Sequence, residues 1–252
     1  MALATYMQRL QRILGDTAFQ RYNPYDLIAY INEGRNQIAT EGECIRFNGT
    51  LSTVNATESY LHTAIGALPT GVSGVMAIWS ITYSTPTPPL LLEGRSWPYF
   101  NQYFRTLAQP TSGTPAQWAQ YQQGTAGSFF IAPVPNGIYP LVLDCVGEPL
   151  AIAKDADPES INYPWTDAIP YYAAQLALRS EGVFDIADQM YATFETYMQR
   201  ARGGVTPGVQ PGNYPGDWRS RRGLPAMAPV VSRGNRDFPP MSQAPQGRPS
   251  GF

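Results

Sequence analysis

The sequence predicts an α+β fold: a helical bundle built from both ends of the folded region, an inserted β-sandwich or barrel-like module, and an extended C-terminal arm. Three observations lead to this prediction. Residues 1–43 and 161–202 carry apolar residues at helical spacing, residues 44–160 are rich in β-forming residues and turn signals, and residues 203–252 are rich in Pro, Gly and Arg. We expect about four helices in the bundle and several strands in the module.

The N-terminal segment predicts two helices. Apolar residues recur on one helical face at positions 3, 6, 7, 10, 13 and 14, and Gly15 is suited to end this first helix. A second helix is expected after Asn23, because Asn is a favourable N-cap and Pro24 fits the first helical position. Gly42 is expected to mark its end.

The middle of the chain predicts strands. Residues 74–83 are rich in β-forming side chains and show the alternation expected of a strand over 76–83. Two further apolar runs, 128–132 and 139–146, are separated by a turn that contains Asn136 and Gly137. Because an Asn-Gly pair is typical of tight β-turns, we expect these two runs to pair as a hairpin.

The segment after the module returns to helical spacing. Thr166 or Asp167 is expected to cap a helix that carries Pro170 in its first turn, where Pro is tolerated. Gly182 predicts a break after this helix. A last helix is expected over about 184–202.

The last 50 residues differ from the rest in composition. They contain 9 Gly, 9 Pro, 6 Arg and 2 Asp, which gives them a net charge of +4. Such a segment cannot offset its ordering entropy by burial on its own domain, so we expect an arm that lies along partners. Its arginine cluster is suited to DNA phosphate or to acidic protein grooves, and we favour the latter. The candidate anchors are Tyr214, Trp218, Arg219, Arg221, Arg222, Leu224, Phe238 and Phe252.

Composition argues against several classes of function. Of the 252 residues, 43% are hydrophobic and 12% aromatic, so most of the chain folds, as one large domain or two small ones. A net charge of −2 argues against a general DNA-coating protein. One histidine and two cysteines, Cys44 and Cys145, cannot build a four-ligand zinc site or a disulfide framework. We expect both thiols to be free, and we expect no metal, no cofactor and no enzymatic activity.

The sequence also predicts no membrane association. It has no run of 18 apolar residues and no basic stretch followed by an apolar one near its start. Of its 17 basic residues, Lys154 is the single lysine. Arg suits protein interfaces better than Lys does, which favours a surface that faces other protein, although codon bias explains the skew equally well.

Two motifs contain residue types that often act in catalysis or metal binding, but in both cases we favour a purely structural role. His62 has no nucleophile or similar catalytic frame around it, so a structural or surface role is expected. Asp155, Asp157 and Glu159 alternate as in calcium loops, but glycine and glutamate are missing from the sixth and twelfth positions. We expect a solvated loop there.

The aromatic residues allow one enzymatic or glycan-binding alternative. Residues 96–105 are rich in aromatics and are expected to form a short helix. Glu93 lies near Trp79, Trp97 and Trp118, and carboxylates among aromatics occur in sugar-binding clefts and glycosidases. Core or interface aromatics are the favoured interpretation.

Several segments resemble the head-to-tail adaptor (connector) proteins of tailed double-stranded DNA bacteriophages, especially short-tailed ones. The resemblance covers most of residues 1–210. It rests on the N-terminal helix and on Tyr25–Arg35, Cys44–Arg46, Ser96–Asn101, Pro115–Tyr121 and Tyr163–Tyr171.

The resemblance implies a structural virion protein located at the head-tail junction and made in the host cytoplasm. Such adaptors form a homo-oligomeric ring, commonly a dodecamer, under the portal protein. They extend the DNA channel, through which genomic double-stranded DNA passes without sequence-specific binding, and they offer a platform to the nozzle or tail. No catalytic residues are implied. The alternatives are another tail component, such as a nozzle or tail-tip protein, or a carbohydrate-binding or carbohydrate-cleaving β-domain.

Overall fold

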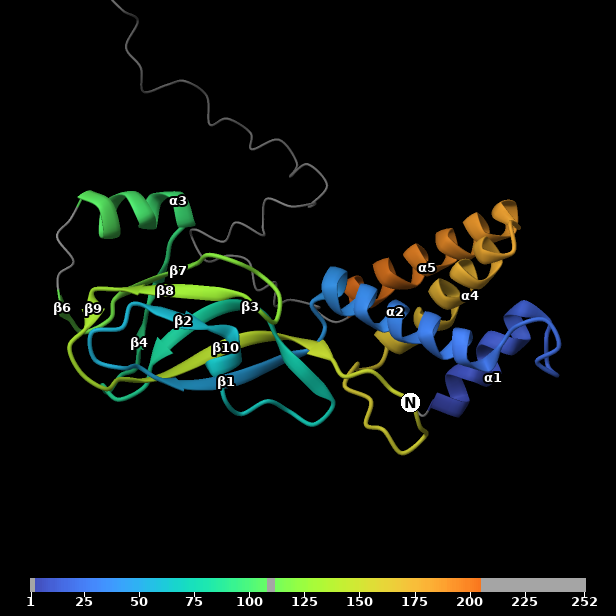
Figure 1. Cartoon of the computed structure of the whole chain (residues 1–252), viewed down its shortest axis with the longest axis horizontal. Helices are drawn as coiled ribbons and strands as arrows, with labels where there is room; N and C mark the ends of the chain where they lie inside the picture. Colours follow the sequence, from blue (N-terminus) through green and yellow to red (C-terminus); the bar gives the residue numbers. More distant parts are fainter. Residues whose placement is uncertain (1–2, 108–111, 205–252) are drawn as a thin grey trace, which may run out of the picture. The chain divides into compact units, whose positions relative to one another are not determined.

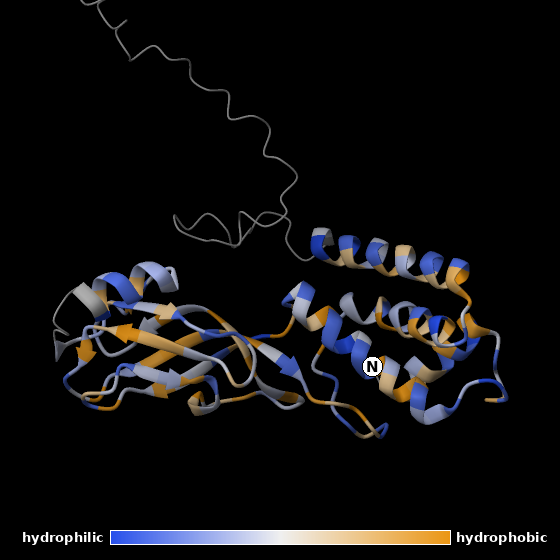
Figure 2. Ribbon diagram, turned by 45° about the horizontal axis from the view of Figure 1, so that its top comes forward, coloured by the Kyte–Doolittle hydropathy of each residue, from blue (hydrophilic) through white to orange (hydrophobic). Residues whose placement is uncertain are grey.

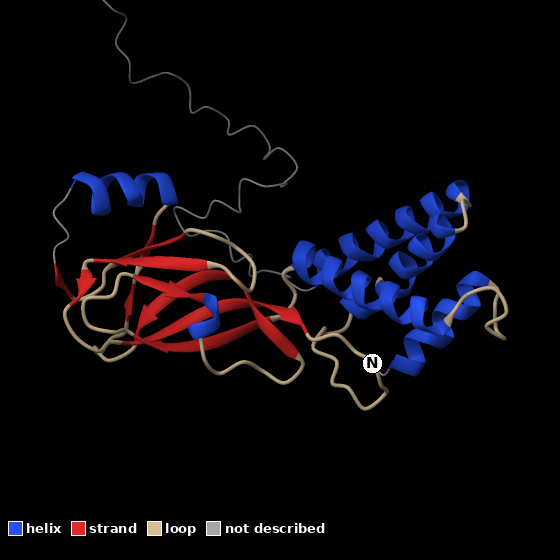
Figure 3. Cartoon of the chain, viewed as in Figure 1, coloured by secondary structure: helices blue, strands red, loops and turns tan. Residues whose placement is uncertain are grey.

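The computed structural model describes residues 3–107 and 112–204 and confirms the mixed α+β class (Figure 1). Helices occupy the beginning and the end of this part of the chain, and strands lie between them in sequence (Figure 3). The long helices are α1 (Leu3–Leu14), α2 (Pro24–Gly42), α4 (Ile169–Ser180) and α5 (Phe184–Gly204). The strands are β1 (Arg46–Ser52), β2 (Ser59–Leu61), β3 (Val72–Tyr83), β4 (Leu90–Leu91), β5 (Glu93–Gly94), β6 (Ser112–Gly113), β7 (Gln117–Gln120), β8 (Ser128–Ala132), β9 (Val134–Pro135) and β10 (Pro140–Pro149).

The first two helices begin and end where the sequence predicts. α1 ends before Gly15, which adopts a left-handed φ of +69°. The Asn23 side chain accepts a hydrogen bond from the backbone N–H of Tyr25, so it caps α2 as expected. α2 ends at Gly42, and Glu43 takes the left-handed conformation after it.

The last two helices also form, but their expected cap was wrong. Neither Thr166 nor Asp167 caps α4, because both lie in a short 3₁₀ turn and Ala168 precedes the helix instead. The Asp167 carboxylate accepts a hydrogen bond from Arg9 Nη1 at 2.6 Å, and an ion pair with α1 thus replaces the cap. Pro170 lies in the first turn of α4, as predicted.

The four long helices share one hydrophobic cluster. Each is amphipathic, with hydrophobic and hydrophilic residues on the same ribbon (Figure 2). Small residues let α4 approach its neighbours closely, and its Ala173, Ala174 and Ala177 are fully buried. The largest buried side chains of the cluster are Tyr6, Leu10, Leu27, Ile31, Ile38 and Phe194. Residues of the strand region also enter this cluster at Ile45, Val72 and Ile152.

The strands form two four-stranded sheets and one two-stranded ribbon. The first sheet has the order β1-β10-β3-β4 and is antiparallel. The second has the order β2-β8-β7-β5, in which β5 pairs with β7 in parallel. A second hydrophobic cluster draws buried residues from both sheets: Leu51, Tyr60, Ile65, Val75, Ile78, Ile81, Leu92, Trp118, Phe129, Ile131, Leu141, Leu143 and Cys145.

The expected hairpin between 128–132 and 139–146 does not form. Both runs are strands, but β8 pairs with β2 and β7, whereas β10 pairs with β1 and β3. The connection is too long for a two-residue turn, and it forms its own short strand, β9, beside β6. Pro133 and Pro135 lack the N–H groups that would continue a ladder between the two runs.

The aromatic segment forms the expected short helix. α3 (Trp97–Phe100) continues into a π-helical segment, Asn101–Leu107. Phe100 is buried in a third small cluster with Ala119 and Ala132. Within the described ranges, no helix has the length and apolarity needed to cross a membrane.

Gly42 lies against a bulky ring, and this contact predicts the effect of substitution. A Cβ added to Gly42 would come 2.6 Å from Trp165 Cζ3. We expect Gly42→Ala to lower the free energy of unfolding by about 1–3 kcal/mol, because buried overpacking forces the ring to move. Gly203→Ala, where nothing lies within 4 Å, is the control and should be neutral or slightly stabilising. Denaturant unfolding of both variants measures the difference, and equal stabilities would contradict the packing.

Candidate functional site

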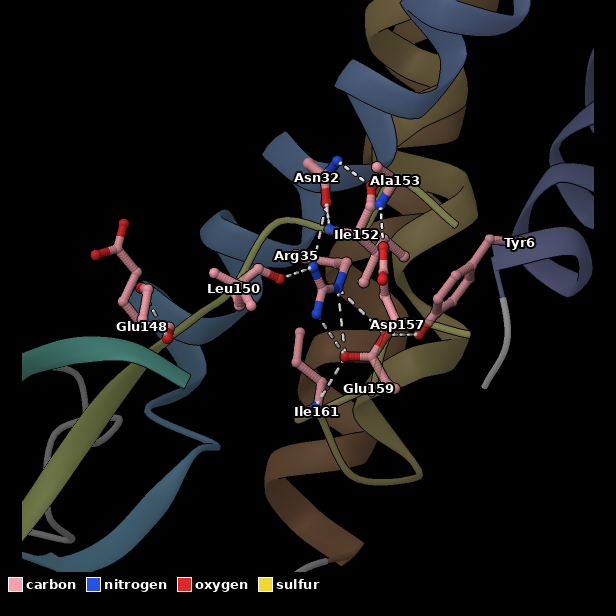
Figure 4. Close-up of polar contacts among 11 residues, drawn as sticks. Tyr6, Asn32, Arg35, Glu148, Leu150, Ile152, Ala153, Asp157, Glu159 and Ile161 are labelled. Atoms are coloured by element: carbon pink, nitrogen blue, oxygen red, sulfur yellow. Dashed lines mark hydrogen bonds and ion pairs between the residues drawn. The ribbon is translucent and has the colours of Figure 1, made fainter. Parts of the chain in front are cut away.

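A buried ion pair lies where α2 meets the chain segment that follows β10 (Figure 4). The side chain of Arg35 is 0% exposed and that of Glu159 is 5% exposed. Arg35 Nη2 donates to Glu159 Oε1 at 2.9 Å, and Arg35 Nε lies 3.3 and 3.2 Å from the two carboxylate oxygens. Arg35 Nη1 donates to Leu150 O at 2.7 Å and to Asn32 Oδ1 at 3.1 Å. The guanidinium therefore has partners on every nitrogen, which is the condition under which a buried charge is tolerated.

Glu159 also binds α1. The Tyr6 hydroxyl donates to Glu159 Oε2 at 2.8 Å, and the backbone N–H of Ile161 donates to Oε1 at 3.0 Å. Burial, followed by the charge of Glu159, raises the pKa of Tyr6 far above its ordinary value. Tyr6 therefore stays protonated and remains a donor. One carboxylate thus connects α1 and α2 to the segment leading into α4.

Asn32 fixes the same segment through its backbone. Its side-chain amide donates to Ile152 O at 2.9 Å and accepts from Ile152 N at 2.9 Å. This reciprocal pair imitates the exchange between two paired strands. Asp157 Oδ2 accepts from the N–H groups of Ala153 and Lys154, both at 2.7 Å, and these bonds lower the pKa of Asp157.

The expectation of a solvated loop at 155–159 was wrong for Glu159. Asp155 accepts from Ala4 N at 2.6 Å and Asp157 folds the loop, but Glu159 is buried by its pairing with Arg35. Sequence reasoning missed Arg35 as the partner of Glu159, and Asn32 as a partner of Arg35. The spacing that places Asn32 and Arg35 on one helix face is a signal, but the carboxylate that Arg35 meets lies 124 residues away. In the described part of the chain, no cluster of His, Cys, Asp or Glu side chains is suited to a metal ion.

The structure does not gather Glu93 and the three tryptophans into one cleft. Glu93 is exposed and pairs with Arg95 at 2.5 Å, and Trp118 is buried between the sheets. Trp97 packs in the third cluster, 4.7 Å from the Phe130 ring centroid. The Trp79 ring lies under the guanidinium of Arg46, which pairs with Asp144.

Trp79 and Trp118 lie on opposite sides of the first sheet, and Trp118 itself belongs to β7 of the second sheet. Asp144, which holds Arg46 over Trp79, alternates along β10 with Leu143 and Cys145. These two neighbours belong to the cluster that contains Trp118. Because successive side chains point to opposite faces of a strand, the sheet separates the two tryptophans.

An aromatic surface with arginines surrounds α3. Tyr99, Tyr103 and Tyr121 are among the exposed large side chains, and the rings of Tyr99 and Tyr103 lie 4.4 Å apart. Arg95 lies 5.2 Å from the Tyr99 ring, and Arg105 lies 4.8 Å from the Phe130 ring. Exposed tyrosine and arginine in this mixture are typical of protein interfaces.

A hollow of about 360 Å³ lies among α1, α4 and α5. It is lined by Arg9, Arg12, Ile13, Asp167, Pro170, Tyr171 and Tyr197. Arg9 pairs with Asp167 inside it, and the rings of Tyr171 and Tyr197 stack at 5.0 Å. A hydrogen bond to Tyr197, followed by burial, raises the pKa of Tyr171. The lining therefore offers the Arg12 cation and the protonated Tyr171 phenol, which suit a carboxylate or a similar oxyanion.

His62 and the cysteines lie inside the protein. His62 is 1% exposed, and its Nδ1 lies 2.8 Å from Gly124 O and 3.2 Å from Val75 O. Two carbonyl neighbours assign the proton to Nδ1. Cys44 packs against the helical cluster and Cys145 is buried in the cluster between the sheets, and both are free. Burial raises the pKa of each thiol to about 12.

The candidate arm residues, from Tyr214 to Phe252, all lie outside the described residues. Neither a protein-family model nor a curated protein matches this chain. Its function is therefore inferred from its residues and their geometry.

Removing the Arg35 cation is expected to destabilise the fold strongly. Arg35→Met leaves the Glu159 carboxylate buried without its partner, so the free energy of unfolding should fall by about 3–5 kcal/mol. Arg179→Met is the matched control, because the Arg179–Asp188 pair has 49% and 68% exposed side chains and should contribute about 0–1 kcal/mol. Adding Glu159→Leu to Arg35→Met should restore part of the loss. Equal effects of the two single variants would contradict a structural role for Arg35.

His62 predicts a decline of stability in mild acid. Burial holds the pKa of His62 below its ordinary value of 6.5, although its two carbonyl contacts oppose this shift. The unfolded chain therefore binds a proton at a pH where the folded chain does not, and the free energy of unfolding should fall as pH drops below about 6.5. Denaturant unfolding at pH 7.5 and 5.5 measures this decline. His62→Gln should flatten it, and an imidazole proton resonance that titrates at or above 6.5 would contradict it.

Proposed function

We propose that this chain is a structural virion protein, a head-to-tail adaptor of a tailed double-stranded DNA bacteriophage. In this proposal, copies of the chain form a ring under the portal protein and extend the DNA channel. The ring carries the nozzle or tail on its other side. The protein then acts by assembly and performs no chemical reaction.

The observation that carries this proposal is that helices from both ends of the described chain pack into one hydrophobic cluster. Helices α1 and α2 precede the strands, α4 and α5 follow them, and all four contribute to one hydrophobic cluster. We interpret this as a helical bundle of residues 1–43 and 161–202 with a sandwich-like insertion of residues 44–160. The bacteriophage adaptors that the sequence resembles share this layout.

The C-terminal composition supports docking on a portal. Residues 203–252 contain 6 of the arginines and several large apolar side chains, but also 9 Gly and 9 Pro. A segment of this kind gains its ordering free energy from a partner surface, and it raises the local concentration of the ring at the portal. We propose that acidic grooves of the portal receive Arg219, Arg221 and Arg222.

The pairing of arginines supports passage of DNA without tight binding. In the described ranges, every arginine except Arg12 and Arg200 forms an ion pair with a carboxylate. Affinity for DNA depends on cations that neutralise phosphates. A surface whose cations are already neutralised is therefore suited to a channel through which DNA slides.

The proposal predicts assembly on a portal ring. Native mass measurement of the purified chain mixed with portal should show a ring in fixed stoichiometry with the portal. A variant that lacks residues 205–252 should lose portal binding at least tenfold while its far-ultraviolet circular dichroism stays unchanged, because the four long helices lie before this segment.

Two outcomes would contradict the proposal. A full-length chain that ignores the portal and binds an isolated nozzle would indicate another tail component. A monomer that binds glycans would favour the carbohydrate-binding alternative, which the separation of Trp79 from Trp118 does not support. Truncation without any effect on portal binding would contradict the role of the arm.

A further inference from the structure

Arg12 and Arg200 are the arginines in the described part of the chain that form no ion pair, and each lies in or near the hollow among α1, α4 and α5. Arg12 lines the hollow among α1, α4 and α5. The guanidinium of Arg200 lies 5.6 Å from the ring of Tyr197, which lines the same hollow. Both arginines are exposed. Within the described residues, the two arginines without an ion pair thus lie at or near one concave surface.

The hollow is shaped for an acidic side chain. Arg9 and Asp167 neutralise each other within it, so Arg12 leaves it with a positive excess. Arg200, next to the Tyr197 ring, adds a second cation nearby. A hydrogen bond to Tyr197, followed by burial, raises the pKa of Tyr171, so this phenol stays protonated and adds no negative charge there. A carboxylate that enters meets a cation and an aromatic wall together, the combination that dominates binding energy at many interfaces.

The complementary surface is on α2. Asp26 and Glu33 lie two helical turns apart on one exposed face of α2, and neither forms an ion pair within the described residues. Glu41 continues this face one turn further on beyond Gln37, with a long contact of 3.8 Å to Arg202. A helix that exposes a row of carboxylates matches a hollow that exposes arginines.

The hollow and the acidic face lie on different sides of the α4–α5 pair. Tyr171 and Tyr172, which are consecutive residues of α4, face these two different sides. Tyr171 faces the hollow, where Arg9 and Tyr197 also lie. Tyr172 faces α2, and burial followed by the charges of Glu33 and Tyr191 raises its pKa. Two unlike surfaces on different sides of one subunit produce a head-to-tail contact, and such contacts generate rings.

We propose that the hollow of one copy receives the acidic face of α2 from a second copy of this chain, with Arg12 opposite Glu33. The occupant is another copy because the charges that the hollow lacks are displayed on the same molecule, on a surface that cannot reach its own hollow across α4 and α5. This inference rests on the proposed ring function and assigns its lateral contact. A surface that binds DNA phosphate is the competing interpretation.

A charge-swap experiment tests the contact. Arg12→Glu and Glu33→Arg each place like charges opposite each other, and each should weaken self-association at least tenfold in sedimentation velocity at low salt. Both side chains are exposed, so circular dichroism should be unchanged. An equimolar mixture of the two variants should regain association, because every contact in the mixture again joins opposite charges. Lys154→Glu, which changes the net charge as Arg12→Glu does, should associate like the wild type.

The outcomes separate this inference from the proposed function. If both variants associate like the wild type, or if the mixture is not rescued, the contact is wrong even when portal binding persists. A wild-type chain that stays monomeric up to its solubility limit also overturns the contact. If Arg12→Glu weakens binding to a duplex DNA oligonucleotide but leaves self-association unchanged, the hollow serves phosphate instead. Failure of the wild-type chain to bind a portal ring contradicts the adaptor function alone.

Discussion

The buried Arg35 guanidinium is the constraint on which the described structure depends. A cation that is 0% exposed requires a carboxylate and further acceptors, because an unpaired buried charge costs several kcal/mol. Its carboxylate, Glu159, comes from the segment after the last strand and also binds Tyr6 of α1. Three parts of the chain that are distant in sequence must therefore meet at one point. The same pairing places the beginning of α4 beside α1 and α2.

This requirement explains how a long β-rich segment can be inserted in the sequence between two pairs of helices that pack together. Arg35 and Asn32 also bind the backbone at Leu150 and Ile152, where the chain leaves β10. The exit of the strand region is thereby fixed to α2, which also provides its entry through Gly42 and β1. With both ends held at one helix, the strands between them complete their own hydrophobic cluster, while Ile45, Val72 and Ile152 of the strand region join the helical one.

Local signals in the sequence predict the local structure, and long-range pairing accounts for the rest. Asn23 and Gly42 mark the ends of α2 because capping depends on neighbouring residues only. The expected hairpin fails because an Asn-Gly pair says nothing of which sheet each flanking strand joins. The Arg35–Glu159 pair was beyond sequence reasoning, since any of several acidic residues offers the same chemistry until the topology selects Glu159. The candidate anchors of the arm lie outside the described residues, and that part of the site stays a prediction.

The charged side chains of the described residues fall into two groups, those that form an ion pair within the chain and those that do not. Where an arginine and a carboxylate meet within the chain, as at Arg21–Glu181 or Arg46–Asp144, their fields largely cancel beyond a few ångströms, and such pairs attract no partner. Arg12, Arg200, Asp26 and Glu33 are not cancelled in this way within the described ranges. Asp26 lies in the first turn of α2 and Arg12 in the last turn of α1, so each stabilises its own helix dipole, but neither has an ion-pair partner within the described residues. The contact between copies that we propose would give these charges partners, with the hollow as its positive side and the α2 face as its negative side.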